Sequence, residues 1–135
     1  MANLTYYSAN RVNDLILGRT AITTPSTFYL GISTTPIQND GTGATEPTAD
    51  TAYARVAIAN NKTNFSTSVS GTINNLVEFG FSESTINQGV ITHWLFSDAL
   101  VGGNIWFQGA LTLPRTVESA TVLVLPIGSF SNTVD

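Results

Sequence analysis

The spacing of the hydrophobic positions changes along the chain, and the first segment has helical spacing. Its apolar residues lie on one face of a helix and are Ala9, Val12, Leu15 and Ile16. The pattern predicts a short amphipathic helix over about residues 5–18, with Thr5 as its N-cap and Gly18 as a left-handed residue at its end. A helix this short is only marginally stable alone, so we expect it to dock on the sheet of its own domain.

From about residue 26 onward, apolar and polar positions alternate, as they do in half-buried strands. The alternating runs cover residues 26–34, 53–59, 72–81, 89–97, 104–113, 120–128 and, as a seventh candidate, 128–134. We therefore expect a mainly β chain, with one domain spanning residues 1–135. Its predicted architecture is an antiparallel β-sandwich or jelly-roll-like barrel of six to seven strands with one N-terminal helix. The sequence shows no repeat of fixed period, which disfavours a propeller or solenoid.

Several of these runs carry large apolar residues on both faces. Alternation places Trp94 and Phe96 opposite Ile91 and Leu95. A sandwich strand usually buries one face only, and one short helix is too small to cover three such strands. We therefore expect a second copy of the chain to cover the other face, with a closed trimer favoured. The residues expected in the core or in a subunit contact are Trp94, Phe96, Trp106, Phe107, Leu123 and Leu125.

A long polar segment, residues 34–51, separates the first two predicted strands. Loops of this length are uncommon in compact domains unless they are functional or mobile, and the turn signals "NDG" and "GTG" predict a projecting hairpin. The residues expected to contact a neighbouring subunit are Pro36, Ile37, Asp40, Glu46 and Asp50. Three of them are acidic, but their spacing fits no calcium loop, and we expect no metal or other cofactor.

Charge narrows the choice of partners. Five basic and nine acidic residues give a net charge of −4, and only 10% of the residues are charged, against about 25% in an average domain. A nucleic-acid partner requires clustered Lys and Arg, so we expect none. No apolar run approaches the roughly 20 residues of a membrane span, so we expect no membrane partner either. The polar surface indicates turn-rich β structure, a surface covered by neighbours, or both.

The stretch "THWLFSD" holds the only histidine of the chain, beside a serine and an aspartate. In an extended strand, Ser97 and Asp98 lie roughly 13–16 Å from His93, at about 3.3 Å per residue, which is too far for a local triad. We therefore expect His93 to be structural. A glycan hydrolase needs two carboxylates about 5–10 Å apart, and Glu78, Glu83 and Asp98 are candidates only by elimination. The sequence therefore favours a protein that is not an enzyme.

A series of short motifs runs through the chain in a fixed order. They lie at Leu4 and Thr5 and at residues 18–20, 29–31, 53–55, 92–94, 102–104 and 109–117, and include "YAR", "THW" and "GGN". In this order the chain resembles a family of small phage virion proteins, described as tail-fibre or head decoration (cement) proteins. Residues 34–50 and "INNLVEFGF" depart from the family pattern.

The resemblance implies a virion component, assembled in the host cytoplasm, without catalytic residues. A single domain without a fibrous repeat favours a capsid decoration protein, which would stabilise the head by contacting several major capsid protein subunits as a homo-oligomer. The alternative is a tail-fibre or baseplate module that recognises host surface glycan. In that case Tyr6, Tyr7 and Tyr53 would stack on sugars, which requires them to cluster in an exposed groove.

Overall fold

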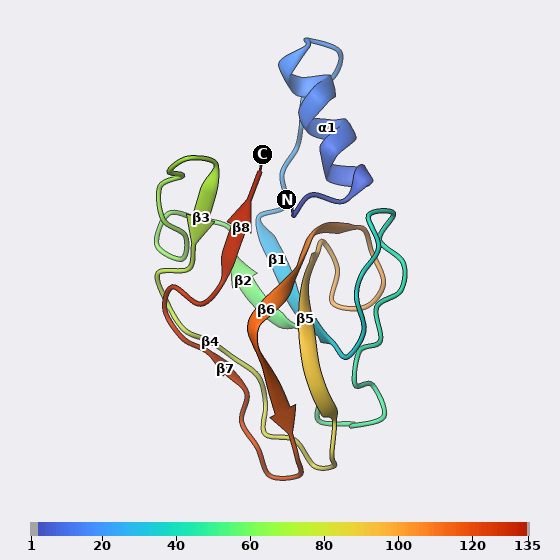
Figure 1. Cartoon of the computed structure of the whole chain (residues 1–135). Coiled ribbons are helices and arrows are strands. Elements are labelled where there is room, and N and C mark those ends of the chain that lie inside the picture. The colour runs from blue at the N-terminus through green and yellow to red at the C-terminus, as the bar shows by residue number, and fades with distance from the viewer. Residues whose placement is uncertain (1–2, 135) are drawn as a thin grey trace.

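Eight strands and one helix form the described part of the chain, residues 3–134 of a computed structural model (Figure 1). They are α1 (Tyr6–Ile16), β1 (Thr27–Ser33), β2 (Val56–Ala59), β3 (Thr72–Asn74), β4 (Phe79–Gly80), β5 (Gly89–Ser97), β6 (Ile105–Val117), β7 (Val124–Leu125) and β8 (Ser131–Thr133). This mainly β, sandwich-like architecture confirms the predicted fold class. Within the described residues no barrel closes, and the strands number eight rather than six or seven.

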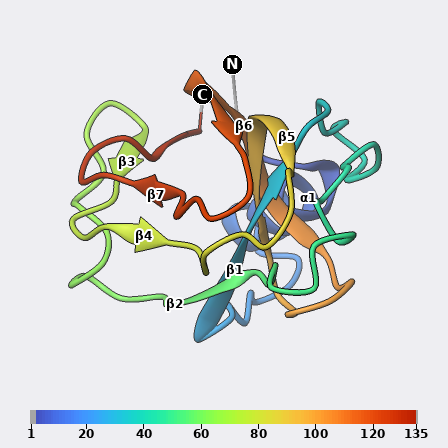
Figure 2. The ribbon, with the colours of Figure 1, turned by 90° about the horizontal axis from the view of Figure 1, so that it is seen from below.

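The sandwich has one regular layer and one irregular layer. The regular layer is an antiparallel sheet of four strands in the order β2–β1–β5–β6. The irregular layer consists of two short ribbons, β3 with β8 and β4 with β7. Figure 2 shows these ribbons on one side of the sheet, with α1 and the segment between β1 and β2 on the other. The sheet therefore has chain on both of its faces.

Aromatic rings join the two layers. Phe130, which precedes β8, stacks on Phe96 of the sheet with 4.7 Å between ring centroids, and lies 4.5 Å from the Trp94 ring. Phe65 contacts Phe96 edge-on at 6.0 Å. Such pairs each contribute about 0.5–1.5 kcal/mol beyond the burial of their area. The other buried residues of this cluster are Phe28, Leu30, Ile32, Ile58, Phe79, Phe81, Ile91, Trp106, Val117, Leu123 and Leu125.

A β-bulge corrects the predicted faces of β5. Simple alternation puts Ile91 on the face opposite Trp94, yet Ile91 is fully buried in the same cluster. The pairing with β6 shifts between Ile91 and His93, which pair with Arg115 and Ala110 respectively. Such a shift rotates the strand locally, so it turns Ile91 inward.

The run predicted as one strand over residues 72–81 is divided into β3 and β4 by Asn75. This buried side chain donates to the backbone oxygens of Val77 and Pro126, at 2.8 and 2.9 Å, and accepts from the N–H of Phe130 at 3.0 Å. Asn75 thus satisfies backbone groups that a continuous strand would pair, so the chain can turn here.

The helix α1 docks through its N-terminal half. Thr5 is its N-cap residue, but the hydroxyl donates to the backbone oxygens of Ile105 and Trp106 instead of capping the helix. Gly18 has a φ of 74°, as predicted for the residue that ends the helix. Leu15 and Ile16 were expected to pack on the sheet, but they are 51% and 73% exposed, and the adjacent Leu17 is 81% exposed. No helix within residues 3–134 is long and apolar enough to cross a membrane.

The two ends of the described chain meet at β6. The Asn3 N–H donates to the backbone oxygen of Thr133 at 2.8 Å, and the Thr133 N–H donates to the Asn3 side chain at 2.6 Å. The carbonyl of Asn3 accepts from the N–H of Gln108 at 2.9 Å. The N-terminal segment therefore covers part of the edge of β6 and ties that edge to β8.

Candidate functional site

The segment between β1 and β2 covers the outer face of the sheet. Leu95, which points away from the aromatic core, is fully buried, and Ile37 of this segment is also buried. Glu46 lies directly over Gly31 of β1. Strand residues with apolar side chains on both faces are thus largely covered within one chain, so this pattern does not require a second copy.

An ion pair holds this segment in place. Both carboxylate oxygens of Glu46 accept from Arg55, at 2.9 and 2.8 Å, and the Tyr53 hydroxyl donates to Glu46 at 2.6 Å. Burial raises the pKa of Glu46, but the hydrogen bonds from Arg55 and Tyr53 outweigh it and lower that pKa below its usual value. Arg55 also donates to the backbone oxygens of Ala99 and Gly102, in the turn between β5 and β6. One arginine therefore ties two loops together.

Asp50 anchors the other end of the segment. Its side chain is 2% exposed and accepts from the Thr85 hydroxyl at 2.6 Å, from the Gln88 amide at 2.9 Å, and from the N–H groups of Thr85 and Ala52 at 3.0 Å each. The hydrogen bonds from Thr85 and Gln88 hold the pKa of Asp50 well below its usual range. The Asp50 carboxylate thus connects the end of this segment to the loop between β4 and β5.

These contacts hold much of the segment of residues 34–51 against its own chain, and its expected contact with a neighbouring subunit stays a prediction for the residues that are exposed. Ile37 and Asp50 are buried within the chain, and Glu46 is paired with Arg55, so these three side chains are not free for a neighbour. Pro36 and Asp40 are exposed. The physical reason is that the sheet needs a cover on its outer face, and this segment provides it.

A polar cleft opens where the two tied loops meet. It has a volume of about 490 Å³, and its lining residues are Tyr7, Asp40, Gly41, Thr42, Gly43, Ala44, Arg55, Gly102, Gly103, Asn104 and Ile105. One wall is the tight turn of residues 40–44, and the other is the turn between β5 and β6. Four glycines with positive φ, at positions 41, 43, 102 and 103, shape these walls. We call this feature the polar cleft.

Hydrogen bonds fix both walls of the polar cleft. Asp40 Oδ1 accepts from the hydroxyl and the N–H of Thr42, at 2.6 and 3.0 Å. These two bonds lower the pKa of Asp40. On the other wall, Asp98 accepts from the N–H of Asn104 at 2.8 Å and from its amide at 3.1 Å. Burial raises the pKa of Asp98, but these bonds and one from Trp106 lower it overall.

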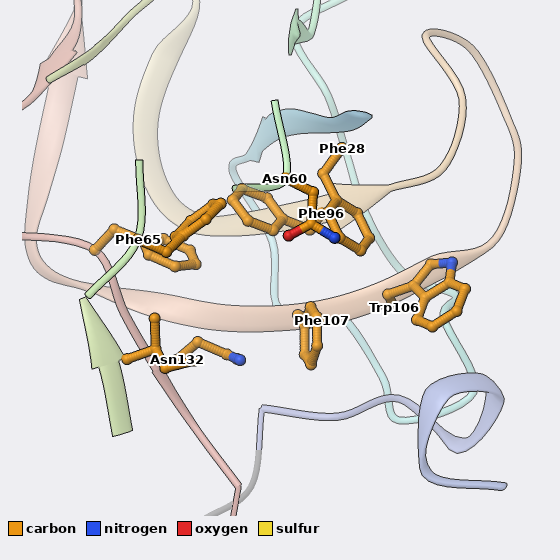
Figure 3. A pocket seen from close by; sticks show the side chains of 9 residues that line it. Phe28, Asn60, Phe65, Phe96, Trp106, Phe107 and Asn132 are labelled. Carbon is orange, nitrogen blue, oxygen red and sulfur yellow. The ribbon is translucent and has the colours of Figure 1, made fainter. Parts of the chain in front are cut away.

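A second, smaller hollow lies between the layers of the sandwich (Figure 3). This aromatic pocket has a volume of about 200 Å³ and is lined by Phe28, Asn60, Phe65, Ile73, Phe96, Trp106, Phe107, Phe130 and Asn132. Figure 3 shows the amides of Asn60 and Asn132 extending among the rings. The Asn132 Oδ1 atom is buried and has no hydrogen-bond partner. The pocket suits an apolar group of about one aromatic ring, since a dry cavity of about 150 Å³ accepts benzene.

The large apolar residues singled out in the sequence lie inside the chain. Trp94, Phe96, Trp106, Leu123 and Leu125 are buried, and Phe107 is half-buried at the aromatic pocket. These side chains pack the protomer core, and only Phe107 retains a substantial accessible area.

The side chains considered for catalysis are not brought together. His93 hydrogen-bonds the neighbouring Thr92 hydroxyl through Nδ1 at 2.7 Å, and burial lowers its pKa. Ser97 donates to the Gly102 oxygen, and Asp98 binds Asn104 and Trp106. Glu78 and Glu83 flank β4 in the irregular layer, whereas Asp98 directly follows β5 of the regular sheet. Among residues 3–134, no three His, Cys, Asp or Glu side chains gather to hold a metal ion.

The three tyrosines considered for sugar stacking do not form one groove. Tyr53 is bound to Glu46, and burial together with that hydrogen bond raises its pKa. Tyr7 contacts the Trp106 ring edge-on at 5.4 Å and carries Arg11 over its ring at 4.5 Å. Tyr6 is exposed. Of these three tyrosines, only Tyr7 lines the polar cleft. The sequence did not predict this cleft, although the two glycine-rich turns that form its walls were visible in it.

A comparison with known protein families identifies the chain. The model of the family described as "Podophage GP4 fiber I protein gp80" matches residues 3–133. The chain belongs to this family. The match confirms the resemblance to phage virion proteins and makes the chain a structural fibre-type component of a virion. No curated protein matches the chain.

Proposed function

We propose that this member of the fiber I family is a non-enzymatic subunit of the tail fibre and takes part in attachment to host surface glycan. The observation that carries the proposal is the family match over residues 3–133. The side-chain arrangement supports it, because Ser97 and Asp98, which were considered for catalysis, serve as hydrogen-bonded braces of the turn between β5 and β6.

The proposed subunit works as a homo-oligomer, with a trimer favoured, and the exposed end of α1 forms a contact between copies. Leu15, Ile16 and Leu17 are three exposed apolar residues at the end of a helix that extends away from the sandwich (Figure 1). Contiguous exposed apolar surface marks an interaction site. Repetition of one heterologous contact closes a ring such as a trimer.

Light scattering coupled to size-exclusion chromatography tests this assembly. We expect the purified chain to run as an oligomer and the triple variant Leu15→Ser, Ile16→Ser, Leu17→Ser to run as a smaller species. A matched control is Val101→Ser, in the turn between β5 and β6, because Val101 is 85% exposed but lies outside α1. If the triple variant forms the same oligomer as the wild type, α1 is not part of the interface. If the wild-type chain is a monomer, the proposal of a homo-oligomer is wrong.

A second candidate is a head decoration protein that contacts several major capsid protein subunits. It is favoured by the scarcity of charge, 10% of residues, because interface cores are depleted in charged groups. Electron microscopy of virions in which an antibody labels this protein distinguishes the tail-fibre subunit from the head decoration protein. Label at the tail supports the fibre subunit, whereas label spread over the head, with added heat resistance of empty heads, supports decoration instead.

A further inference from the structure

We infer that the polar cleft is a binding site for a neutral sugar unit of a host surface polysaccharide. The inference rests on the proposed role of the chain in the fibre and names the ligand class and the residues. Its walls come from the turn of residues 40–44 and from residues 102–105, with Tyr7 beside them.

The polar groups around the cleft retain unused hydrogen-bonding capacity. The Tyr7 hydroxyl, Asp40 Oδ2 and Asn104 Oδ1 have no hydrogen-bond partner within residues 3–134. The backbone N–H groups of Gly43 and Gly103 are likewise unpaired within that range. A sugar hydroxyl both donates and accepts. A ring bearing several hydroxyls can therefore use the carboxylate and amide oxygens as acceptors and the N–H groups as donors.

The site is formed before any ligand binds. The Gln38 N–H donates to the Thr42 oxygen at 2.7 Å, which closes the first turn. A Cβ on Gly103 would lie 2.5 Å from Asp98 Oδ1, so the second turn fits closely around its aspartate. Arg55 ties this turn to Glu46 of the other loop. Loops that are already ordered lose little conformational freedom on binding, which matters for weak ligands such as sugars.

The charges around the cleft select against anionic ligands. Asp40 lies on one wall and Asp98 supports the other. Among residues 3–134, the only cation that lines the cleft is Arg55, and its charge is matched by Glu46 at 2.8 Å. Arg11, which lies 4.5 Å from the centre of the Tyr7 ring, offsets one of the two aspartates. Because the remaining field is negative, sialylated, sulfated or phosphorylated sugars are repelled, whereas neutral sugars are not. The ionised Asp40 also gives a neutral sugar a strong acceptor.

The test measures sugar binding by the intact chain. The biotinylated protein, displayed on streptavidin, is applied to an array that carries neutral and sialylated oligosaccharides in equal density. We expect binding to neutral structures and not to their sialylated counterparts. The strongest neutral ligand is then titrated by NMR. We expect Asp40→Asn to weaken binding about tenfold or more and Tyr7→Phe about two- to tenfold, as expected for loss of a charged and a neutral hydrogen bond.

Matched controls keep the result interpretable. Tyr6→Phe and Asp14→Asn change the same residue types on α1 outside the cleft, and both should bind as the wild type does. If Asp40→Asn lowers the melting temperature, Asn104→Ala replaces it as the second cleft variant. Absence of binding to every neutral structure, preference for sialylated ones, or unchanged affinity in the cleft variants would overturn the inference. A chain located on the tail fibre that binds no sugar loses this inference and the proposed glycan attachment, but it keeps its role as a fibre subunit, which is read from the virion.

Discussion

Glu46 lies so close above Gly31 that a Cβ atom at position 31 would be 2.7 Å from its Oε1 atom. The same Cβ would be 2.9 Å from Leu95 Cδ1. The buried ion pair of Glu46 with Arg55 thus depends on a residue without a side chain in the strand beneath it. The glycine in "YLGIS" is explained by this approach and not by an unusual backbone angle, since its φ is not positive.

Gly31→Ala tests this contact. We expect it to lower the free energy of unfolding by about 1–3 kcal/mol, the usual cost of overpacking a filled site. The measurement is urea denaturation followed by tryptophan fluorescence. The control is Gly80→Ala in β4, where a Cβ would meet only Val124 Cγ2 at 3.9 Å. Equal stability of the two variants would show that Glu46 moves aside without cost.

Removing Arg55 should be more damaging than removing the pair. Arg55→Met leaves the Glu46 carboxylate partly buried without its partner, which costs about 3–5 kcal/mol in comparable pairs. The double variant Glu46→Gln, Arg55→Met should recover part of that loss. Unfolding free energies of the wild type, both single variants and the double variant complete the cycle. A double variant that merely sums the single losses would mean that the two side chains act independently.

Phe130 is the ring that joins the two layers, through Trp94 and Phe96. We expect Phe130→Ala to destabilise the chain by about 3–5 kcal/mol because it leaves a cavity in a packed core. Ile127→Ala, three residues earlier and 64% exposed, serves as control and should change stability by less than about 0.5 kcal/mol. If Phe130→Ala changes the free energy of unfolding only slightly, the irregular layer does not unfold cooperatively with the four-stranded sheet.

Asp50 should make the chain sensitive to acid. Its folded-state pKa lies below the value of an unfolded aspartate, about 3.9. The folded state therefore takes up the proton less readily, and the stabilisation is fully present above the unfolded pKa and lost as the pH falls through the folded value. We expect the unfolding free energy to fall from about pH 5 downward. Asp50→Asn should be less stable at pH 7 and show a shallower acid dependence. An unchanged acid slope would assign the effect to Asp40, Glu46 and Asp98, whose pKa values are also lowered.

Local pattern predicted the bounds of the longer strands well. The run of residues 89–97 coincides with β5, and the glycine at position 18 adopts the expected left-handed backbone. Ile91 was placed on the wrong face because the bulge beside it arises from pairing with β6, and alternation within one strand carries no information on its partner. In the same way, the division of residues 72–81 depends on Asn75 reaching Pro126, far away in sequence.

The cover of the outer face could not be predicted from periodicity. The segment of residues 34–51 looks like a solvated arm because its residues are mainly polar, yet Asp50 finds Thr85 and Glu46 finds Arg55 as partners. Burial of a carboxylate depends on such partners, which only the fold brings near. The polar cleft could not be predicted for the same reason. Each of its two turns was recognisable in the sequence, but only the fold shows that they face each other.

The pairing of Asn3 with Thr133 joins residues separated by 130 positions. Closing a loop of that length costs entropy that is recovered only when most of the sandwich is in place. During synthesis, β3 therefore keeps an open edge until its partner strand β8 has been made. Until then, β8 of a neighbouring nascent chain can pair with that edge. The late pairing of the C-terminal strand therefore gives two copies of the chain an opportunity to exchange this strand.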